Sequence, residues 1–153
     1  MNKKIEDINI VKYEDKYKEK IIEFLICVAI GEFGYTEWEN YFKTKSFEPY
    51  KNNEGEFLIA LNKQNKIIGT CGALKKNDKT VKLNSFYILS EYRDKGIGKK
   101  LYDTIMNYII EEKYKEIILC TFEKFNIAIE FYKKRGYELY ETIDDEFWYK
   151  KEL

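Results

Sequence analysis

Histidine is absent from the 153-residue chain, proline occurs once, and the charges cancel, with 27 Lys and Arg against 27 Asp and Glu. Without histidine, and with no cysteine pair at metal-ligand spacing, no zinc or other metal site is expected. Without net charge, no long-range field favours nucleic acid or an acidic membrane surface. The 14 Tyr and 10 Phe fall mostly at strand and helix spacing, so core packing explains them better than base stacking.

Long hydrophobic runs are also missing. The longest, residues 21–30, is interrupted by Glu23 and is too short to span a bilayer. The N-terminal residues, MNKKIEDINI, lack the apolar core of a signal peptide. Cys27, Cys71 and Cys120 are far apart in apolar surroundings, which predicts buried, reduced thiols. Together these features predict one soluble, cytoplasmic domain over residues 1–153.

The stretch from residue 82 to 102, KLNSFYILSEYRDKGIGKKLY, joins a strand to a helix through a glycine loop. Residues 83–89 have the β-branched, aromatic and aliphatic content of a buried strand. From Ile97 the apolar period changes to about 3.6, which predicts a helix. The first amides of a helix lack intrahelical partners, and glycines let backbone N–H groups approach one anion closely. The stretch therefore predicts a phosphate or pyrophosphate site.

Two common phosphate motifs fit this loop poorly. A dinucleotide fingerprint requires a third glycine where Leu101 stands. A P-loop requires glycine at Arg93 and Ser or Thr at Lys100. The pattern that is present is Arg93-x-x-Gly96-x-Gly98 after a hydrophobic strand. The alternative to a phosphate site is that the glycines only form a turn at the start of the helix and bind no ligand.

The rest of the chain alternates helical and strand patterns. A helix is expected after Asp15 as its N-cap, ending near Gly31, and Thr36 with Glu39 forms the pattern of a capping box. Residues 43–55 are interpreted as a surface connection, and Gly136 closes a helix over residues 127–135. The expected strands are residues 5–11, 56–61, 66–74, 83–89, 116–122, 137–142 and 147–151, with residues 116–122 parallel to the preceding strand because a helix joins them.

The glycine pattern resembles the acyl-CoA signature of the GNAT superfamily of N-acyltransferases. The order β-α-α-β-β-β-α-β-α-β-β is similar to the GNAT order over essentially the whole chain. The resemblance implies an α+β fold with a mostly antiparallel sheet of six to seven strands, one parallel pair and about four helices. Residues 128–137, AIEFYKKRGY, match the family pattern A-x-x-F-Y-x-x-x-G-F, with Tyr137 in place of Phe.

The resemblance implies a role for each matching residue. Tyr132 corresponds to the family's usual general acid, because a phenol of pKa near ~10 can protonate a departing thiolate. Many relatives carry an Asn at the position of Phe125, and here Asn126 is displaced by one. The implied cofactor-binding residues are Phe86, Tyr87, Ile88, Arg93, Asp94, Lys95, Gly96, Ile97, Gly98, Lys99, Asn126 and Tyr132.

A general base must take a proton from the incoming ammonium, and without histidine a carboxylate is the natural choice. Glu32 and Glu37 are the candidates, although an acid of this kind, taken alone, is more often a solvated surface residue than a base. Cys120 lies inside an apolar strand, where a thiol is usually inert, so a covalent intermediate on it is not expected.

We therefore expect an acetyl-CoA-dependent N-acetyltransferase acting on a primary amine of a small molecule or protein. The alternatives are a GNAT-like domain that senses acyl-CoA without turnover, and a different nucleotide-binding protein. Acidic residues at Glu32, Glu37, Glu39 and positions 144–146 weakly favour a cationic amine. The aromatic strand Phe147-Trp148-Tyr149 suggests pairing across a homodimer.

Overall fold

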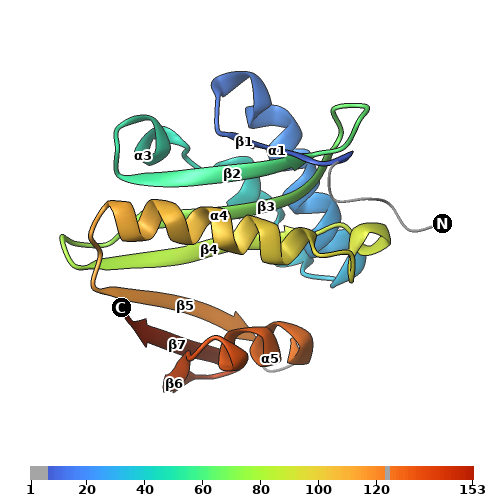
Figure 1. Cartoon of the computed structure of the whole chain (residues 1–153). Helices are drawn as coiled ribbons and strands as arrows, with labels where there is room; N and C mark the ends of the chain where they lie inside the picture. The colour runs from blue at the N-terminus through green and yellow to red at the C-terminus, as the bar shows by residue number, and fades with distance from the viewer. Residues whose placement is uncertain (1–6, 123–124) are drawn as a thin grey trace.

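The computed structural model describes residues 7–122 and 125–153. One seven-stranded sheet in the order β1-β2-β3-β4-β5-β7-β6 forms the centre of the molecule (Figure 1). The β4–β5 pair is parallel and the other strand pairs are antiparallel. This confirms the expected fold class. The strands are β1 (Asn9–Lys12), β2 (Gly55–Leu61), β3 (Ile67–Lys75), β4 (Thr80–Ile88), β5 (Glu116–Phe122), β6 (Glu138–Ile143) and β7 (Glu146–Glu152).

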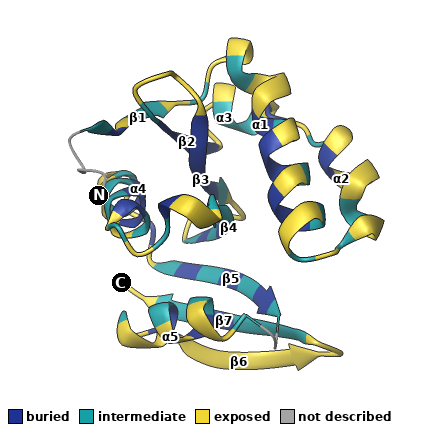
Figure 2. Ribbon diagram, turned by 90° about the vertical axis from the view of Figure 1, so that its right-hand side faces the viewer, coloured by how far each residue is buried: buried dark blue, intermediate teal, exposed yellow. Residues whose placement is uncertain are grey.

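The helices lie on both faces of the sheet. α1 and α2 are on one side, and α4 and α5 are on the other (Figure 2). The α-helices are α1 (Lys18–Ile26), α2 (Glu39–Lys43), α3 (Glu48–Lys51), α4 (Ile97–Glu111) and α5 (Asn126–Lys134). Shorter helical turns are η2 (Asp15–Tyr17), η3 (Cys27–Glu32), η4 (Thr36–Trp38) and η5 (Ser90–Tyr92). None of the helices in the described ranges has the length and apolar character needed to cross a lipid bilayer.

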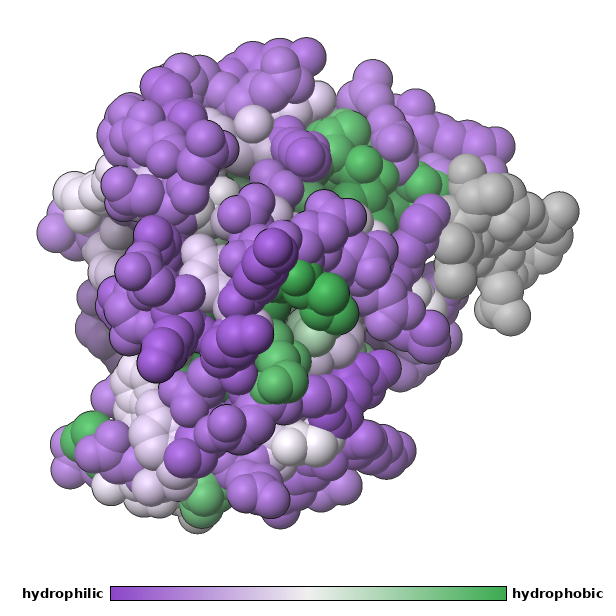
Figure 3. Space-filling view, turned by 60° about the vertical axis from the view of Figure 1, so that its left-hand side comes forward, coloured by the Kyte–Doolittle hydropathy of each residue, from purple (hydrophilic) through white to green (hydrophobic). Residues whose placement is uncertain are grey.

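Each face of the sheet has its own hydrophobic core. Ile97, Leu101, Ile105 and Ile109 recur every four residues along α4, and all four are buried against the sheet. The opposite core holds the buried residues of α1 together with Phe57 and Ile59 of β2. Complete burial of one such side chain contributes about 1.5–3 kcal/mol to the free energy of unfolding. Hydrophilic residues dominate the surface in the view of Figure 3, where hydrophobic side chains form only small patches.

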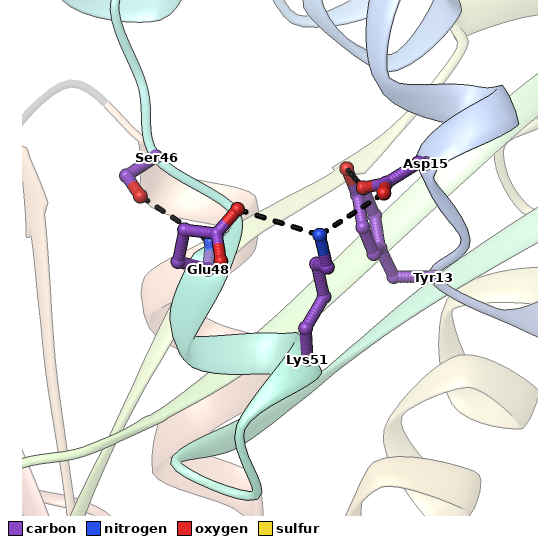
Figure 4. Close-up of polar contacts among 5 residues, drawn as sticks. All are labelled: Tyr13, Asp15, Ser46, Glu48 and Lys51. Carbon is purple, nitrogen blue, oxygen red and sulfur yellow. Dashed lines mark hydrogen bonds and ion pairs between the residues drawn. The ribbon is translucent and has the colours of Figure 1, made fainter.

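Two expected helix caps are wrong. Glu14, not Asp15, precedes η2, and the Asp15 carboxylate instead accepts hydrogen bonds from Tyr13 Oη and Lys51 Nζ, each 3.0 Å long. Lys51 also contacts Glu48, so this cluster joins α3 to the start of the α1 region (Figure 4). Thr36 and Glu39 do not form a capping box, because η4 begins at Thr36 itself without a side-chain cap.

Three further expectations need correction. The first strand begins at Asn9 rather than residue 5, and residues 5 and 6 lie outside the described ranges. The connection over residues 43–55 contains α3. Phe47, the residue before α3, is buried in the core, and its ring stacks on that of Tyr13. Cys71 is buried, but Cys120 is half-buried and Cys27 is exposed because it lies on the outer side of η3.

The C-terminal strands also differ in one respect from expectation. β7 lies between β5 and β6, and Phe147 and Tyr149 are paired on both sides. The aromatic strand therefore has no free edge for pairing across a dimer, because β6 is the outer strand. A homodimer itself stays a prediction.

Candidate active site between two diverging strands

A bulge in β4 opens the sheet at its centre. Gly72 faces Asn84 and Thr70 faces Tyr87, so Cys71 of β3 opposes two residues, Ser85 and Phe86. Ser85 has a φ of 52°, a left-handed backbone that a bulge requires and that L-residues rarely adopt. Beyond Lys82, no residue of β4 is paired with β5. The backbone edges of residues 83–88 and 119–122 therefore diverge.

A cavity of about 90 Å³ fills the space between the diverging strands. Its walls carry unpaired backbone from both strands and side chains from α5, which suits an extended polar ligand that takes the place of a strand. The lining residues are Leu83, Asn84, Ser85, Phe86, Tyr87, Leu119, Cys120, Thr121, Phe122, Phe125, Ala128 and Tyr132. Of the expected cofactor-binding residues, Phe86, Tyr87 and Tyr132 meet in this cavity.

Tyr132 is the phenol that α5 brings to the cavity. Its ring packs edge-on against Tyr137 and Phe86, with centroids 5.4 and 6.4 Å away. Only 7% of the residue is exposed, and burial raises the pKa of Tyr132 far above its usual value. The hydroxyl is therefore protonated throughout the neutral range, as a proton donor must be.

The glycine loop begins α4 with two left-handed residues, Asp94 (φ 60°) and Gly96 (φ 81°). Gly96 is the N-cap, and the amide of Lys100 is the first to donate back to the Gly96 carbonyl, at 3.1 Å. The amides of Ile97, Gly98 and Lys99 thus stand at the positive end of the helix dipole. This backbone geometry concentrates N–H donors on a small volume, as anion sites do.

Gly98 is not required by packing within the protein. An added Cβ would meet its nearest neighbours, Ile88 and Phe86, at an ordinary 3.8 Å, and its φ is not in the left-handed region. Glycine in a helix costs about 0.5–1 kcal/mol relative to alanine. A ligand that approaches the backbone at this position explains the glycine physically, so the chain fits a phosphate-bearing group here.

Arg93 and Glu32 lie together beside the loop. Arg93 Nε donates to the Ile88 carbonyl at 2.9 Å, and its guanidinium forms an ion pair with Glu32. The other carboxylate oxygen of Glu32 accepts the Ser90 amide at 3.2 Å. The Arg93 guanidinium also stacks over Phe33 at 5.6 Å. These contacts connect the end of η3 to the end of β4, so the Arg93 side chain has a structural role here. We call this set of contacts the Arg93 brace.

Lys95, Lys99, Glu37 and Asn126 do not line the cavity. Lys95 is half-exposed in the loop, and Lys99 is bound to Asp103 at 2.8 Å. Glu37 is exposed on η4, next to Trp38, whose ring lies 5.0 Å from that of Phe122 in the cavity wall. Asn126 is exposed at the start of α5 and lines a separate surface depression with Glu130 and Lys134.

Several cavity residues escaped the sequence analysis. Phe125 lines the cavity where Asn126 does not, and its ring contacts Phe33 at 4.8 Å. Cys120 also faces the cavity and donates to Glu146 Oε2 at 3.6 Å. Burial and the neighbouring carboxylate raise the pKa of Cys120 to about 12, which disfavours the thiolate. Alternation along β5 was the available signal for Cys120, and the signal for Phe125 was its match to the position where many relatives carry an Asn.

Comparison with known proteins identifies the family. The family described as acetyltransferase (GNAT) matches residues 13–137. Human N-acetyltransferase 8 is 28% identical over 94 residues, which are 58% of this chain and 41% of that protein, so the chain spans less than half of that relative. An acetyltransferase of the GNAT family from Staphylococcus aureus has 28% identity and a TM-score of 0.83, covering 95% of this chain and 99% of that one.

Two more solved structures share the fold. An acetyltransferase from Streptococcus agalactiae has 25% identity and a TM-score of 0.82 over 97% of this chain and all (100%) of that one. The PaiA N-acetyltransferase from Thermoplasma acidophilum, in complex with coenzyme A, has 21% identity and a TM-score of 0.81, covering 95% and 99% of the two chains. The present chain belongs to the acetyltransferase (GNAT) family, which supports an acyltransferase activity consistent with N-acetyl transfer.

Proposed function

We propose that this protein transfers acetyl from acetyl-CoA directly to a primary amine. The observation that carries the proposal is the opening between β4 and β5, with a protonated phenol on one wall and the α4 N-terminus nearby. Bound acetyl-CoA supplies an acyl thioester, whose carbonyl carbon is open to attack by an amine. The family match and the coenzyme A complex of the PaiA relative favour this co-substrate.

The residues divide between binding and proton transfer. The backbone of Phe86, Tyr87 and Ile88 is not paired with β5 and is proposed to hold the pantetheine arm as an added strand, with the Ile88 carbonyl already accepting from Arg93 Nε. The N–H groups from Asp94 to Lys99 are proposed to hold the pyrophosphate. Tyr132, which is protonated at neutral pH, then donates its phenolic proton to the departing sulfur.

The proton of the incoming ammonium requires a separate base. Both carboxylate oxygens of Glu32 already accept hydrogen bonds, from Ser90 and Arg93. Glu37 is exposed on η4, the element that packs against the cavity wall through Trp38. We therefore favour Glu37, acting through water, and assign Glu32 to positioning the Arg93 brace.

The engagement of Glu32 also favours one alternative, an acyl-CoA sensor with little turnover. In that case the same cavity and loop bind the ligand, but no residue accepts the ammonium proton.

We assign the cytoplasm as the compartment, consistent with three free cysteines.

Calorimetric titration with acetyl-CoA, CoA and ATP tests the cofactor assignment. We expect saturable binding of the two CoA compounds and none of ATP. A screen of primary amines that follows free-thiol release then separates enzyme from sensor. Binding without thiol release for any amine would support the sensor, and absence of CoA binding would refute both functions.

A further inference from the structure

The opening between β4 and β5 passes through the sheet, so side chains from both faces reach it. Asn84 comes from the face that carries α1. An added Cβ on its cross-strand partner Gly72 would meet both Asn84 and Phe57, and Phe57 belongs to the α1 core. Tyr132 belongs to the opposite core, with α4 and α5. Both Asn84 and Tyr132 line the cavity of about 90 Å³, so a group held inside it lies between an amide and a phenol.

The Asn84 side chain is fixed by two features on the β3 side. Its Oδ1 accepts the Tyr50 hydroxyl at 3.4 Å. Gly72 makes room for this oxygen, because a Cβ there would come within 2.8 Å of Oδ1. The backbone is fixed as well: Asn84 is the last residue of β4 paired with β3 before the bulge, and the next carbonyl, that of Ser85, accepts from Thr70 at 2.6 Å. The amide is thus held in place by the protein itself.

The nitrogen of this amide has no partner. Asn84 Nδ2 is inaccessible to solvent, and no atom of residues 7–122 and 125–153 accepts its hydrogen bond. Since Oδ1 is turned towards β3, Nδ2 lies on the side of β5, where Asn84 lines the cavity. Buried donors are normally paired, so an orphaned donor beside a cavity points to a ligand that carries an acceptor atom. Entry of this ligand requires the gap to widen slightly, which a β4–β5 ladder of three residue pairs permits.

The proposed reaction leaves one atom in need of such a donor. The incoming amine brings N–H groups of its own, so it requires a base or an acceptor rather than another donor. The departing sulfur is served by Tyr132 on the opposite wall. The acetyl carbonyl oxygen remains, and it gains negative charge when the amine attacks. None of the described residues that line the cavity is a lysine, an arginine or a carboxylate, so a fixed neutral N–H dipole is what this site offers that charge.

We propose that Asn84 is a catalytic residue whose Nδ2 donates a hydrogen bond to the acetyl carbonyl oxygen of acetyl-CoA. The amine nitrogen bonds to the carbonyl carbon while the π pair of the C=O bond moves onto the oxygen, where Nδ2–H stabilises it. The pair returns as the C–S bond breaks, and the sulfur leaves with the Tyr132 proton. The ammonium gives one proton to Glu37 through water before the attack and a second to Tyr132 through solvent after it. This inference rests on the proposed acetyl transfer, because it adds the group that stabilises charge in that step.

Kinetics of variants test this role. Asn84→Ala should lower kcat by about 100-fold or more, the cost of removing one such donor in acyl transfer, with little change in KM for the amine. Asn62→Ala is the matched control. Asn62 Nδ2 donates to the Tyr92 hydroxyl at 3.2 Å away from the cavity lining, so its loss should affect stability rather than kcat. A raised KM for the amine with kcat unchanged would show that Asn84 binds the acceptor instead, and would refute the proposal.

Binding measurements without an amine keep the test independent of turnover. S-ethyl-CoA has a methylene where acetyl-CoA has the carbonyl, and the wild-type chain should bind acetyl-CoA about 2–10-fold more tightly, the effect of one hydrogen bond. Asn84→Ala should bring this ratio close to one, and Asn62→Ala should retain it. Infrared difference spectra of bound acetyl-CoA, isotope-labelled at the carbonyl carbon, should place the carbonyl stretch at a lower wavenumber in the wild type than in Asn84→Ala.

The outcomes separate this inference from the proposed function. An affinity ratio and a carbonyl stretch that Asn84→Ala leaves unchanged would refute the role of Asn84 and leave acetyl transfer standing. A stretch that depends on Asn84, without thiol release for any amine, would retain the contact and refute turnover. Absence of acetyl-CoA binding would refute both.

Discussion

Thr70 in β3 donates a 2.6 Å hydrogen bond from Oγ1 to the carbonyl oxygen of Ser85, the left-handed residue of the β4 bulge. Thr70 is fully buried, so no water replaces this contact. The hydrogen bond satisfies a carbonyl that the bulge removes from the sheet ladder. It therefore holds β4 in the conformation that diverges from β5.

Thr70→Val should lower the free energy of unfolding by about 1–3 kcal/mol, because it leaves the Ser85 carbonyl buried without a donor. Acetyl-CoA affinity should fall as well, since the bulge shapes the cavity. Urea denaturation and calorimetry measure the two effects. Thr70→Ser retains the hydroxyl and is the control; equal damage from both substitutions would point to packing instead.

Gly98→Ala should leave the free energy of unfolding unchanged or slightly raised, because the new Cβ meets only ordinary contacts. Acetyl-CoA affinity should fall by about 10-fold or more through the loss of close backbone approach. Gly136→Ala should do the opposite, since φ is 89° there and alanine costs about 1–2 kcal/mol in that conformation. Unchanged affinity in Gly98→Ala would show that the ligand does not approach this amide.

Tyr132→Phe should lower kcat by about 100-fold or more while acetyl-CoA affinity stays within a few-fold, because only the proton donor is removed. Tyr102→Phe is a suitable control. Its buried hydroxyl bonds to that of Tyr137 at 2.9 Å, so its loss should reduce stability with little effect on kcat. Full activity in Tyr132→Phe would exclude this phenol as the acid.

Glu37→Gln should lower kcat by about 10-fold or more at neutral pH without changing the melting temperature, since Glu37 is exposed. Glu32→Gln should weaken the contact with Arg93 and reduce acetyl-CoA affinity, with a cost in stability of about 1 kcal/mol for a partly exposed pair. Steady-state kinetics across pH distinguish the two carboxylates. If neither substitution alters kcat, the base lies elsewhere.

Stability should decline in alkaline solution. Burial raises the pKa of Tyr87 and of Tyr50 from 10.0 to about 12, so the folded state holds these protons more tightly than the unfolded chain. Their contribution is complete below pH 10 and is lost as the pH rises from about 10 towards 12, by at most about 1.4 kcal/mol per pH unit for each group. Urea denaturation from pH 8 to 11.5 measures the slope, which Tyr87→Phe should reduce. A slope that this substitution leaves unchanged would contradict the assignment.

Local patterns predicted much of this fold. The helix starts at Ile97 as the change of period indicated, and Gly136 adopts the left-handed conformation expected of a residue that ends a helix. The parallel arrangement of β5 followed from its connection through α4. Each of these features depends on residues adjacent in sequence, which is why the sequence alone could indicate them.

Contacts over long sequence separations were beyond such patterns. Asp15 has the residue type of a helix cap, but Lys51 competes for its carboxylate from 36 residues away. The contact between Lys82 and Trp148 was missed for the same reason. In sequence Lys82 is a polar residue alternating in a strand, and only the folded chain brings the Trp148 ring to 5.0 Å from its ammonium.

The ladder that joins β4 to β5 contains three residue pairs, Thr80 with Glu116, Val81 with Ile117 and Lys82 with Ile118. Mechanically, the sheet is thus two plates, β1–β4 and β5–β7, fastened along one short seam. A ligand laid along the open part of the seam bridges both plates and fixes their spacing. Occupancy of the cavity should then stiffen strands that the ligand never touches, and amide hydrogen exchange in β7 becomes a gauge of what is bound beside β4.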